Sequence, residues 1–202
     1  MRKVPAVNSP AFWDNLYRQG SDAWDTGAPT PAFLDLMNGG DLQPGTALVL
    51  GCGKGQDAVS FAEHRFAVTA VDFSGEALQR ARSLARDKGV QARFLHADLF
   101  GLPPDQEGAY DYVIEYVTYC AIDPLRRRDF VNVVANALKP GGRFVALLFP
   151  IDSRPGGPPF AVPVRETLRL FSDRLDLISL EFPERSVAPR RGKEVMTIWL
   201  KR

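Results

Sequence analysis

The sequence predicts an open, doubly wound α/β sheet of seven strands, mostly parallel and closed at its C-terminal end by an antiparallel hairpin. Three observations support this fold class. Short runs of apolar and β-branched residues alternate with helical patterns along most of the chain. The first run leads directly into closely spaced glycines. The last two runs are joined by a loop too short for a crossover helix, so they should pair antiparallel.

Each strand is expected where a short apolar run stands between turn residues, and each helix where apolar residues recur at helical spacing. Ser74 is a candidate N-cap, and residues 139–142 (Lys-Pro-Gly-Gly) signal the end of the helix before them. The expected strands are residues 46–50, 67–71, 92–96, 110–115, 143–149, 175–182 and 194–200. The expected helices are residues 56–64, 76–86, 125–138 and 164–172. Ligands of such sheets bind at the carboxyl ends of the strands, near the point where strand order reverses.

Size and charge favour one domain over residues 1–202, which we expect to be a monomer. A chain of 202 residues that is 45% hydrophobic can bury its own core. A net charge of +1 argues against a nucleic-acid-binding protein, which usually has a clear basic excess. Basic clusters occur at residues 126–128 and 190–191. We expect a solvated helix face and an exposed basic loop, with a polar or anionic substrate near one cluster as the alternative.

The two cysteines, Cys52 and Cys120, indicate neither a disulfide framework nor a metal site, and they fit a reducing compartment. The first five residues lack the apolar run of a signal peptide. The longest apolar stretch, residues 144–149, is far too short to span a bilayer. A soluble, cytoplasmic protein without membrane contact is therefore expected.

The glycine loop at residues 51–55 indicates a cofactor site. Gly51, Gly53 and Gly55 follow a predicted strand and open a predicted helix, where they allow a tight turn and close approach of a ligand. A dinucleotide site needs the spacing Gly-x-Gly-x-x-Gly, but here Gln56 follows the third glycine. Asp57, in the first helical turn, would disfavour a pyrophosphate but tolerate the α-ammonium group of S-adenosylmethionine. The alternative is that Asp57 only caps its helix.

Acidic residues follow the next two predicted strands. Asp72 is placed to accept hydrogen bonds from both ribose hydroxyls, and Asp98 could receive the adenine amino group. Either carboxylate could instead be a helix cap. The neighbouring Phe73 and Leu99 are expected to contact the same nucleoside. Together with the glycine loop, these strand ends favour S-adenosylmethionine as the cofactor.

Four segments now carry a family resemblance. They are residues 12–29 (Phe-Trp-Asp onward), 116–122 (Tyr-Val-Thr-Tyr-Cys-Ala-Ile), 156–159 (Gly-Gly-Pro-Pro) and 192–194 (Gly-Lys-Glu). Their order resembles that of the thiopurine and thiol/halide methyltransferase superfamily, and is most similar to the thiol/halide enzymes. The resemblance implies a class I methyltransferase fold, Rossmann-like, and an enzyme that moves a methyl group from S-adenosylmethionine to a small soft nucleophile.

The resemblance also implies an N-terminal helical lid, residues 1–40, whose aromatic rings close over the cofactor. These rings fall on Trp13, Tyr17 and Trp24, and Tyr17 departs from the family's more usual tryptophan. Residues 13 and 17 share a helix face, and aromatic faces near a sulfonium gain about 0.5–2 kcal/mol of cation–π attraction. The alternative is that the rings only anchor the segment to the sheet. Tyr116 is likewise implied to contact the cofactor.

Methyl transfer from a sulfonium needs orientation and desolvation more than a base. The only histidines, His64 and His96, belong to no recognisable triad, which fits a thiol acceptor; halides, thiopurines and tellurium or selenium species are alternatives. Candidate acceptor-pocket residues are Tyr119, Cys120 and Phe160; Cys120 is expected to be a small buried residue, not a nucleophile. Phe160 replaces a tyrosine usual in the plant enzymes and favours an apolar acceptor.

Two different classes of protein stay open at this point. A nicotinamide-dependent reductase would share the strand–helix pattern but lacks its glycine spacing here. A non-catalytic S-adenosylmethionine-binding protein would keep the glycine loop and lose the acceptor loops.

Overall fold

The structure is a computed structural model that describes residues 6–202; residues 1–5, where a signal peptide was not expected, lie outside the described part. It contains one seven-stranded sheet with the order β3-β2-β1-β4-β5-β7-β6. The strands are β1 (Thr46–Leu50), β2 (Ala67–Asp72), β3 (Arg93–His96), β4 (Tyr110–Tyr116), β5 (Leu138–Leu148), β6 (Leu175–Glu181) and β7 (Val195–Lys201). The helices are α1 (Pro10–Gln19), α2 (Pro31–Gly39), α3 (Gln56–Glu63), α4 (Gly75–Asp87), α5 (Arg127–Ala137) and α6 (Val164–Ser172).

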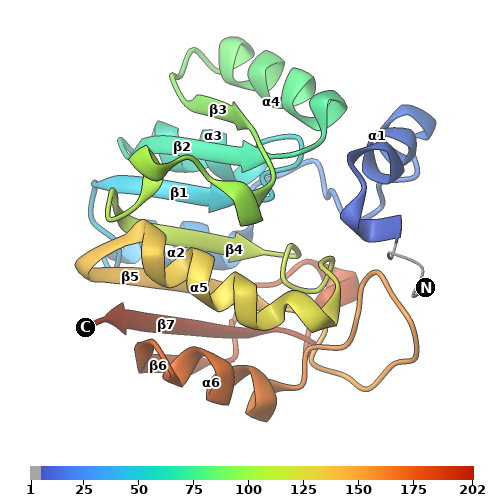
Figure 1. The fold of residues 1–202 in the computed structure, drawn as a ribbon. Coiled ribbons are helices and arrows are strands. Elements are labelled where there is room, and N and C mark those ends of the chain that lie inside the picture. Colours follow the sequence, from blue (N-terminus) through green and yellow to red (C-terminus); the bar gives the residue numbers. More distant parts are fainter. Residues whose placement is uncertain (1–5) are drawn as a thin grey trace.

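The pairing of the strands confirms the predicted fold class. Strands β1 to β5 are parallel to one another, whereas β7 runs antiparallel to both β5 and β6. The strand order reverses between β1 and β4: from β1 the chain adds β2 and then β3 on one side, and from β4 it adds β5 on the other. Figure 1 shows α1 beyond the arrowheads of the parallel strands, at the edge where ligands of doubly wound sheets bind.

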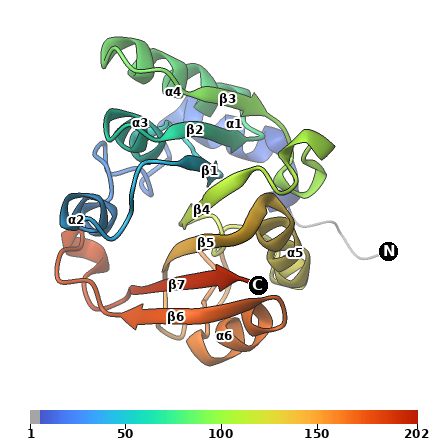
Figure 2. The same cartoon turned by 90° about the vertical axis from the view of Figure 1, so that its left-hand side faces the viewer.

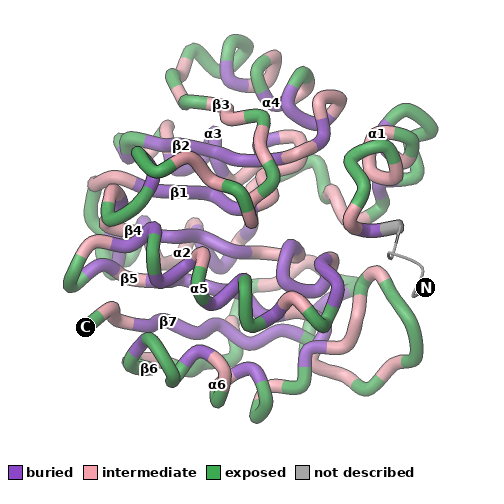
Figure 3. The backbone as a smooth tube through the Cα atoms, viewed as in Figure 1, coloured by how far each residue is buried: buried purple, intermediate pink, exposed green. Residues whose placement is uncertain are grey.

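Two hydrophobic cores fill the two faces of the sheet. Strand β1 contributes to both, since alternate side chains of a strand point to opposite faces. Leu48 and Leu50 pack in the core beneath α5 and α6, whereas Ala47 and Val49 pack in the core beneath α2 and α3. Figure 2 shows α2 and α5 on opposite sides of the sheet, and Figure 3 shows that the central strands are largely buried. Burial on both faces explains why β1 is a continuous apolar run.

One element boundary differs from the prediction by more than two residues. Strand β5 begins at Leu138 rather than at residue 143, so the Lys-Pro-Gly-Gly segment belongs to the strand. Tyr110 pairs with Leu138 and Tyr112 pairs with Arg143, so the extra residues form a bulge near the start of β5. A bulge tolerates a proline, which cannot donate to the ladder, and Gly141 there has a φ of 76°. Helix α5 ends at Ala137, just before this segment, and the chain continues directly as strand.

The N-terminal lid divides into two parts. Helix α2 packs on the sheet with Phe33 fully in the core, whereas α1 lies against α4 at the carboxyl edge. Ser74 caps α4 as predicted, because its Oγ accepts from the amide of Ala77 at 3.1 Å. The same Oγ donates to Asp14 of α1 at 2.6 Å, so one serine joins both helices. Among residues 6–202, no helix has the length and apolar character needed to cross a bilayer.

Candidate functional site

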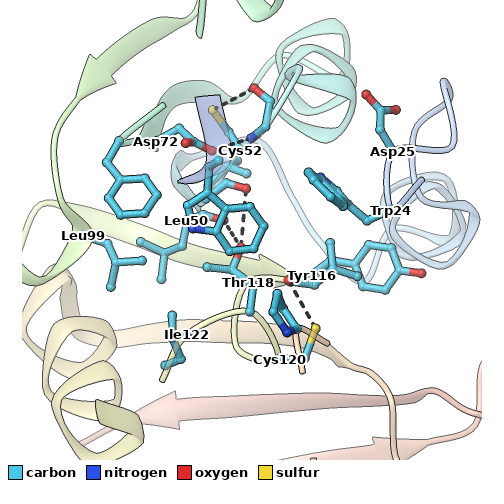
Figure 4. Close-up of a pocket in the computed structure, with 18 of the residues that line it drawn as sticks. Trp24, Asp25, Leu50, Cys52, Asp72, Leu99, Tyr116, Thr118, Cys120 and Ile122 are labelled. Carbon is cyan, nitrogen blue, oxygen red and sulfur yellow. Dashed lines mark hydrogen bonds between the residues drawn. The ribbon is translucent and has the colours of Figure 1, made fainter. Parts of the chain in front are cut away.

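A cavity of about 460 Å³ opens at the carboxyl edge of the sheet, between the lid and the ends of β1, β2 and β4 (Figure 4). Its walls come from six segments: the lid, the glycine loop, the turn after β2, the turn after β3, the loop after β4, and the loop after β5. The expected cofactor-binding residues in its lining are Trp13, Tyr17, Trp24, Gly51, Gly53, Asp57, Asp72, Phe73, Asp98, Leu99 and Tyr116.

The glycine loop needs its glycines for two separate reasons. Gly51 has a φ of 55°, and a Cβ there would lie 2.3 Å from the Oγ1 of Thr118, which donates to the carbonyl of Leu50 at 2.9 Å. Gly51 therefore permits the loop after β4 to close on β1. Gly55 lies outside the cavity lining, and a Cβ there would lie 2.8 Å from the Cβ of Ala81 in α4. The third glycine therefore permits close packing between α3 and α4.

Asp72 joins the glycine loop to the turn after β2. Its carboxylate accepts from the amides of Gly53 and Ser74, both at 2.9 Å. Only 9% of the residue is exposed, and this burial raises the pKa of the carboxyl group. The carboxylate keeps further acceptor capacity, since each oxygen can take more than one hydrogen bond. Asp72 is thus a fixed acceptor at the cavity wall, where the ribose hydroxyls are expected.

Asp98 caps a short helix and lines the cavity at the same time. It caps the short 3₁₀-helix Leu99–Gly101 by accepting from the amide of Phe100 at 2.9 Å, and it also lines the cavity. The cap orients the carboxylate beside Leu99, and Phe73 completes this end of the lining.

Asp57 neither caps its own helix nor stands alone in the cavity. It accepts from the amide and the hydroxyl of Thr30, at 2.7 and 2.9 Å, while α3 has no side-chain cap. Burial raises the pKa of Asp57 to about 6. The helix-cap alternative is therefore wrong: the carboxylate fastens the end of the lid, where α2 begins, to the glycine loop.

The three aromatic residues of the lid form one cluster at the cavity. The Trp24 ring meets those of Trp13 and Tyr17 edge to face, with both centroid distances at 5.5 Å. Its Nε1 donates to the Tyr17 hydroxyl at 3.4 Å. Tyr17 is only 4% exposed, and a Cβ on Gly53 would lie 3.0 Å from its hydroxyl. The rings both anchor the lid and border the cavity.

Tyr116 is held against the cavity by two buried charges. Its hydroxyl donates to Glu194, and the Arg190 guanidinium lies 5.0 Å from the centre of its ring. Arg190 also donates to the carbonyl of Trp24 and stacks 5.1 Å from the Phe149 ring. The expectation of an exposed basic loop at residues 190–191 is wrong for Arg190, which is 6% exposed. The expectation of a solvated helix face at residues 126–128 is likewise wrong for Arg127, whose side chain is equally buried and donates to the carbonyl of Ala161 at 2.6 Å.

Two of the three candidate acceptor residues lie outside the cavity lining. Tyr119 is 1% exposed and packs in the core on Phe130 and Phe171. Phe160 turns its ring back over Gly157, and its amide donates to the carbonyl of Cys120 at 2.7 Å. Pro158 and Pro159 line the cavity in its place. Only Cys120 lines the cavity as expected, and it is 2% exposed.

The side chain of Cys120 is suited to packing. Its thiol lies 3.3 Å from the carbonyl oxygen of Val117, and burial raises its pKa. The thiolate needed for nucleophilic attack is therefore disfavoured. This agrees with the expectation that Cys120 is a small buried residue.

Glu115 is a site residue that the sequence reasoning missed. Its Oε1 accepts from the amides of Thr118 and Tyr119, at 2.9 and 2.8 Å. These bonds hold the turn at Val117, a β-branched residue with a φ of 58° that lines the cavity. A carboxylate at the carboxyl end of an apolar strand was the available signal. Arg190 and Lys54, by contrast, offered no such signal in the sequence.

The doubly wound sheet carries a glycine turn after β1, carboxylates at the ends of β2 and β3 that can accept hydrogen bonds, and an aromatic lid. This combination defines a class I S-adenosylmethionine-dependent methyltransferase. The chain belongs to the thiopurine S-methyltransferase (TPMT) family, whose sequence model matches residues 8–200. It is accordingly an enzyme, and S-adenosylmethionine is its cofactor.

Similar proteins agree with this assignment over nearly the full chain. "Probable thiol methyltransferase 2" of Arabidopsis thaliana is 35% identical over 98% of this chain and 88% of its own length. "Thiocyanate methyltransferase 1" of Brassica oleracea is 33% identical with the same two coverages. Among solved structures, the 1,6-didemethyltoxoflavin-N1-methyltransferase of Burkholderia thailandensis shares the fold, with a TM-score of 0.73 and 24% identity. That comparison covers 97% of this chain and 88% of the other.

The residues around the cavity fit this cofactor better than a dinucleotide. Gly53 lines the cavity without a side chain, so a ligand can approach its backbone closely. Asp57 lies half-buried in the first turn of α3, at the position where a dinucleotide would put its pyrophosphate. An anion is unwelcome beside that carboxylate, whereas the ammonium group of S-adenosylmethionine is not.

Proposed function

We propose that the enzyme methylates the sulfur of a small organic thiol. The observation that carries the proposal is the composition of the cavity beyond the lid, where the lining side chains are mostly apolar. Ile122, Phe149, Pro158 and Pro159 lie there together with the neutral thiol of Cys120. Among the described residues that line the cavity, there is no histidine to act as a base. Such a wall suits an acceptor with an apolar body and a soft nucleophile.

The residues that would hold the cofactor follow from the geometry of the cavity. Asp72 would accept from the ribose hydroxyls and Asp98 from the adenine amino group, while Phe73 and Leu99 would contact the nucleoside. The sulfonium of S-adenosylmethionine supplies an electrophilic methyl group and a positive charge. Trp13, Tyr17 and Trp24 would face that charge and exclude water, which leaves the acceptor sulfur less solvated and more reactive.

The acceptor would arrive with its proton already partly lost. A thiol with a pKa of about 8.5 is a few per cent ionised at neutral pH, so no dedicated base is required. Arg190 lies behind the Tyr116 and Phe149 rings, and its positive charge favours an anionic sulfur in front of them. The main contributions of the protein would be orientation and desolvation.

Thiocyanate is the second candidate acceptor. The buried cation of Arg190 would favour an anion in this part of the cavity, and two of the similar plant proteins are named thiocyanate methyltransferases. The apolar lining favours the thiol because a small hydrated anion gains little from contact with Ile122 and Pro158.

An acceptor panel with product analysis by mass spectrometry tests the proposal. The panel contains a small aromatic thiol, thiocyanate, iodide, a thiopurine, and tellurite and selenium species, each with S-adenosylmethionine. We expect kcat/KM to be highest for the thiol. Faster methylation of iodide would overturn the acceptor assignment. Calorimetric binding of S-adenosylmethionine without methyl product from any acceptor would indicate a non-catalytic binding protein.

We further propose that the chain acts as a single-domain monomer in the cytoplasm, without nucleic-acid or membrane partners. Both cysteines are free, as they would be in a reducing compartment. Size-exclusion chromatography with light scattering tests the oligomeric state, and a dimer mass would contradict it.

A further inference from the structure

The glycine loop carries a lysine that binds the lid. Lys54 Nζ lies 2.6 Å from Oδ2 of Asp22 and 3.3 Å from Oδ2 of Asp25. The two aspartates flank Trp24, in the lid turn 22–25 between α1 and α2. Their side chains are only 10% and 8% exposed, and Lys54 and Asp25 both line the cavity. One ammonium group therefore joins the loop under the cofactor to the turn above it.

This contact consists mostly of charge. Within the described residues, neither Oδ2 atom accepts a hydrogen bond of good geometry. Arg80 is 3.6 Å from Asp22, and 40% of its side chain is exposed. If Lys54 lost its charge, two nearly buried carboxylates would face each other with weak compensation. Like charges in a partly desolvated place repel strongly, so the turn would move toward water.

Trp24 is also held from its other side. Arg190 donates to the backbone carbonyl of Trp24, and Asp25 Oδ1 accepts from the amide of Gly27 at 2.7 Å. The first bond ties the turn to the loop before β7, and the second stiffens the turn itself. In Figure 4, Trp24 and Asp25 lie side by side at the cavity, above Tyr116. The Lys54 ion pairs are the link between this turn and the cofactor loop.

We propose that Lys54 is a positioning residue: through Asp22 and Asp25 it holds Trp24 over the cavity and so keeps the cofactor enclosed. The inference rests on the proposed function only in that the cavity binds S-adenosylmethionine. It does not depend on the identity of the acceptor. Cofactor exchange then requires the ion pairs to break, which makes the turn 22–25 the part of the lid whose opening limits release.

Three variants test the inference. Lys54→Met keeps the length of the side chain and removes its charge, whereas Lys54→Arg keeps the charge. Arg18→Met is the matched control, because Arg18 also joins the lid to the body, through Glu76 at 2.8 Å, but is 54% exposed. The readouts are hydrogen exchange of the amides of residues 20–28 without cofactor, calorimetry with S-adenosylhomocysteine, and KM and kcat for S-adenosylmethionine.

We expect Lys54→Met to raise exchange in the turn and to weaken S-adenosylhomocysteine binding about tenfold, with a larger change in KM than in kcat. Lys54→Arg should keep exchange in the turn and S-adenosylhomocysteine affinity close to those of the wild type. Arg18→Met should change exchange and affinity by less than about threefold, since exposed ion pairs contribute little. Adding Asp25→Asn to Lys54→Met should lower exchange again, because it removes one of the two unpaired charges. If Lys54→Met does not fold, the Asp22→Asn and Asp25→Asn single variants provide the same measurements.

Three outcomes would overturn the inference. Unchanged exchange and unchanged binding in a folded Lys54→Met would show that the ion pairs do not hold the turn. Weaker binding with unchanged exchange would mean that Lys54 contacts the cofactor directly. Equal effects in Arg18→Met would mean that any ion pair between the lid and the body has this effect, and that the Lys54 ion pairs have no special role. Failure of the wild type to methylate any acceptor would contradict the proposed function alone, since the exchange and calorimetry measurements need no acceptor.

Discussion

Replacing Glu115 by glutamine should remove a pH-dependent loss of stability. The carboxylate is 1% exposed, and no cation pairs with it among the described residues. Its Oε1 accepts two amide hydrogen bonds, and its Oε2 has no partner in the described structure. Glutamine can keep both accepted bonds through its own carbonyl oxygen. The substitution therefore changes charge and leaves the turn at Val117 in place.

The size of the effect follows from the pKa of Glu115. Burial raises this pKa from an ordinary 4.5 to about 7. The folded state consequently holds the proton more tightly than the unfolded state. Wild-type stability from this group is fully present below pH 4.5 and is lost as the pH rises to 7. A difference of about 2.5 pKa units corresponds to roughly 3 kcal/mol of unfolding free energy.

Urea unfolding monitored by tryptophan fluorescence, at a series of pH values from about 4.5 to 8, measures this difference. The unfolding free energy of Glu115→Gln minus that of the wild type should increase by about 3 kcal/mol across the series. Glu107→Gln, at an exposed position, is the control and should run parallel to the wild type. Parallel curves for Glu115→Gln and the wild type would refute the reasoning, because they would mean that the fold does not shift this pKa.

Three further predictions concern the cofactor and the chemistry. Asp72→Ala should weaken S-adenosylhomocysteine binding by about tenfold or more, because charge-assisted hydrogen bonds contribute about 1.5–3 kcal/mol; calorimetry on the folded variant would contradict this by finding wild-type affinity. Gly51→Ala should lower the melting temperature and cofactor affinity together, since its Cβ would lie 2.3 Å from Thr118; a wild-type melting curve would count against that steric argument. Cys120→Ala should keep kcat for a thiol acceptor within about threefold, as expected of a packing residue; loss of activity with an unchanged melting temperature would assign the thiol a chemical role.

The alternation of apolar runs and helical patterns was enough to predict the sheet. Strands such as β1 are buried on both faces, so they appear in the sequence as continuous apolar runs that are easy to recognise. The start of β5 was missed because a proline followed by glycines usually marks a turn after a helix and not the beginning of a strand. Only the pairing of Tyr110 with Leu138 shows that these residues form a bulge in β5. The local sequence shows that the chain can turn here, but it does not show which strand these residues pair with.

The candidate site was predictable where function sits at strand ends and unpredictable where it depends on docking between distant segments. Asp72 and Asp98 follow strands that sequence patterns locate, so their place at the cavity could be inferred. The partner of Asp57 is Thr30, 27 residues away, and the partner of Arg190 is Trp24, 166 residues away. No local pattern marks such pairs. Tyr119 and Phe160 were misplaced because the direction of a side chain in a loop depends on the packing around it.

The point between β1 and β4 where the strand order reverses separates the expected cofactor site from the proposed acceptor site. Apart from Tyr116 at the end of β4, the expected cofactor contacts of the body follow β1, β2 and β3 on one side, whereas the proposed acceptor wall comes from the loops after β4 and β5 on the other. Mutations in the loop that contains Pro158 can therefore change the acceptor without altering the nucleoside site. Such modularity offers evolution a simple way to diversify substrates within a lineage, and it makes this loop a natural segment to exchange between relatives in engineering.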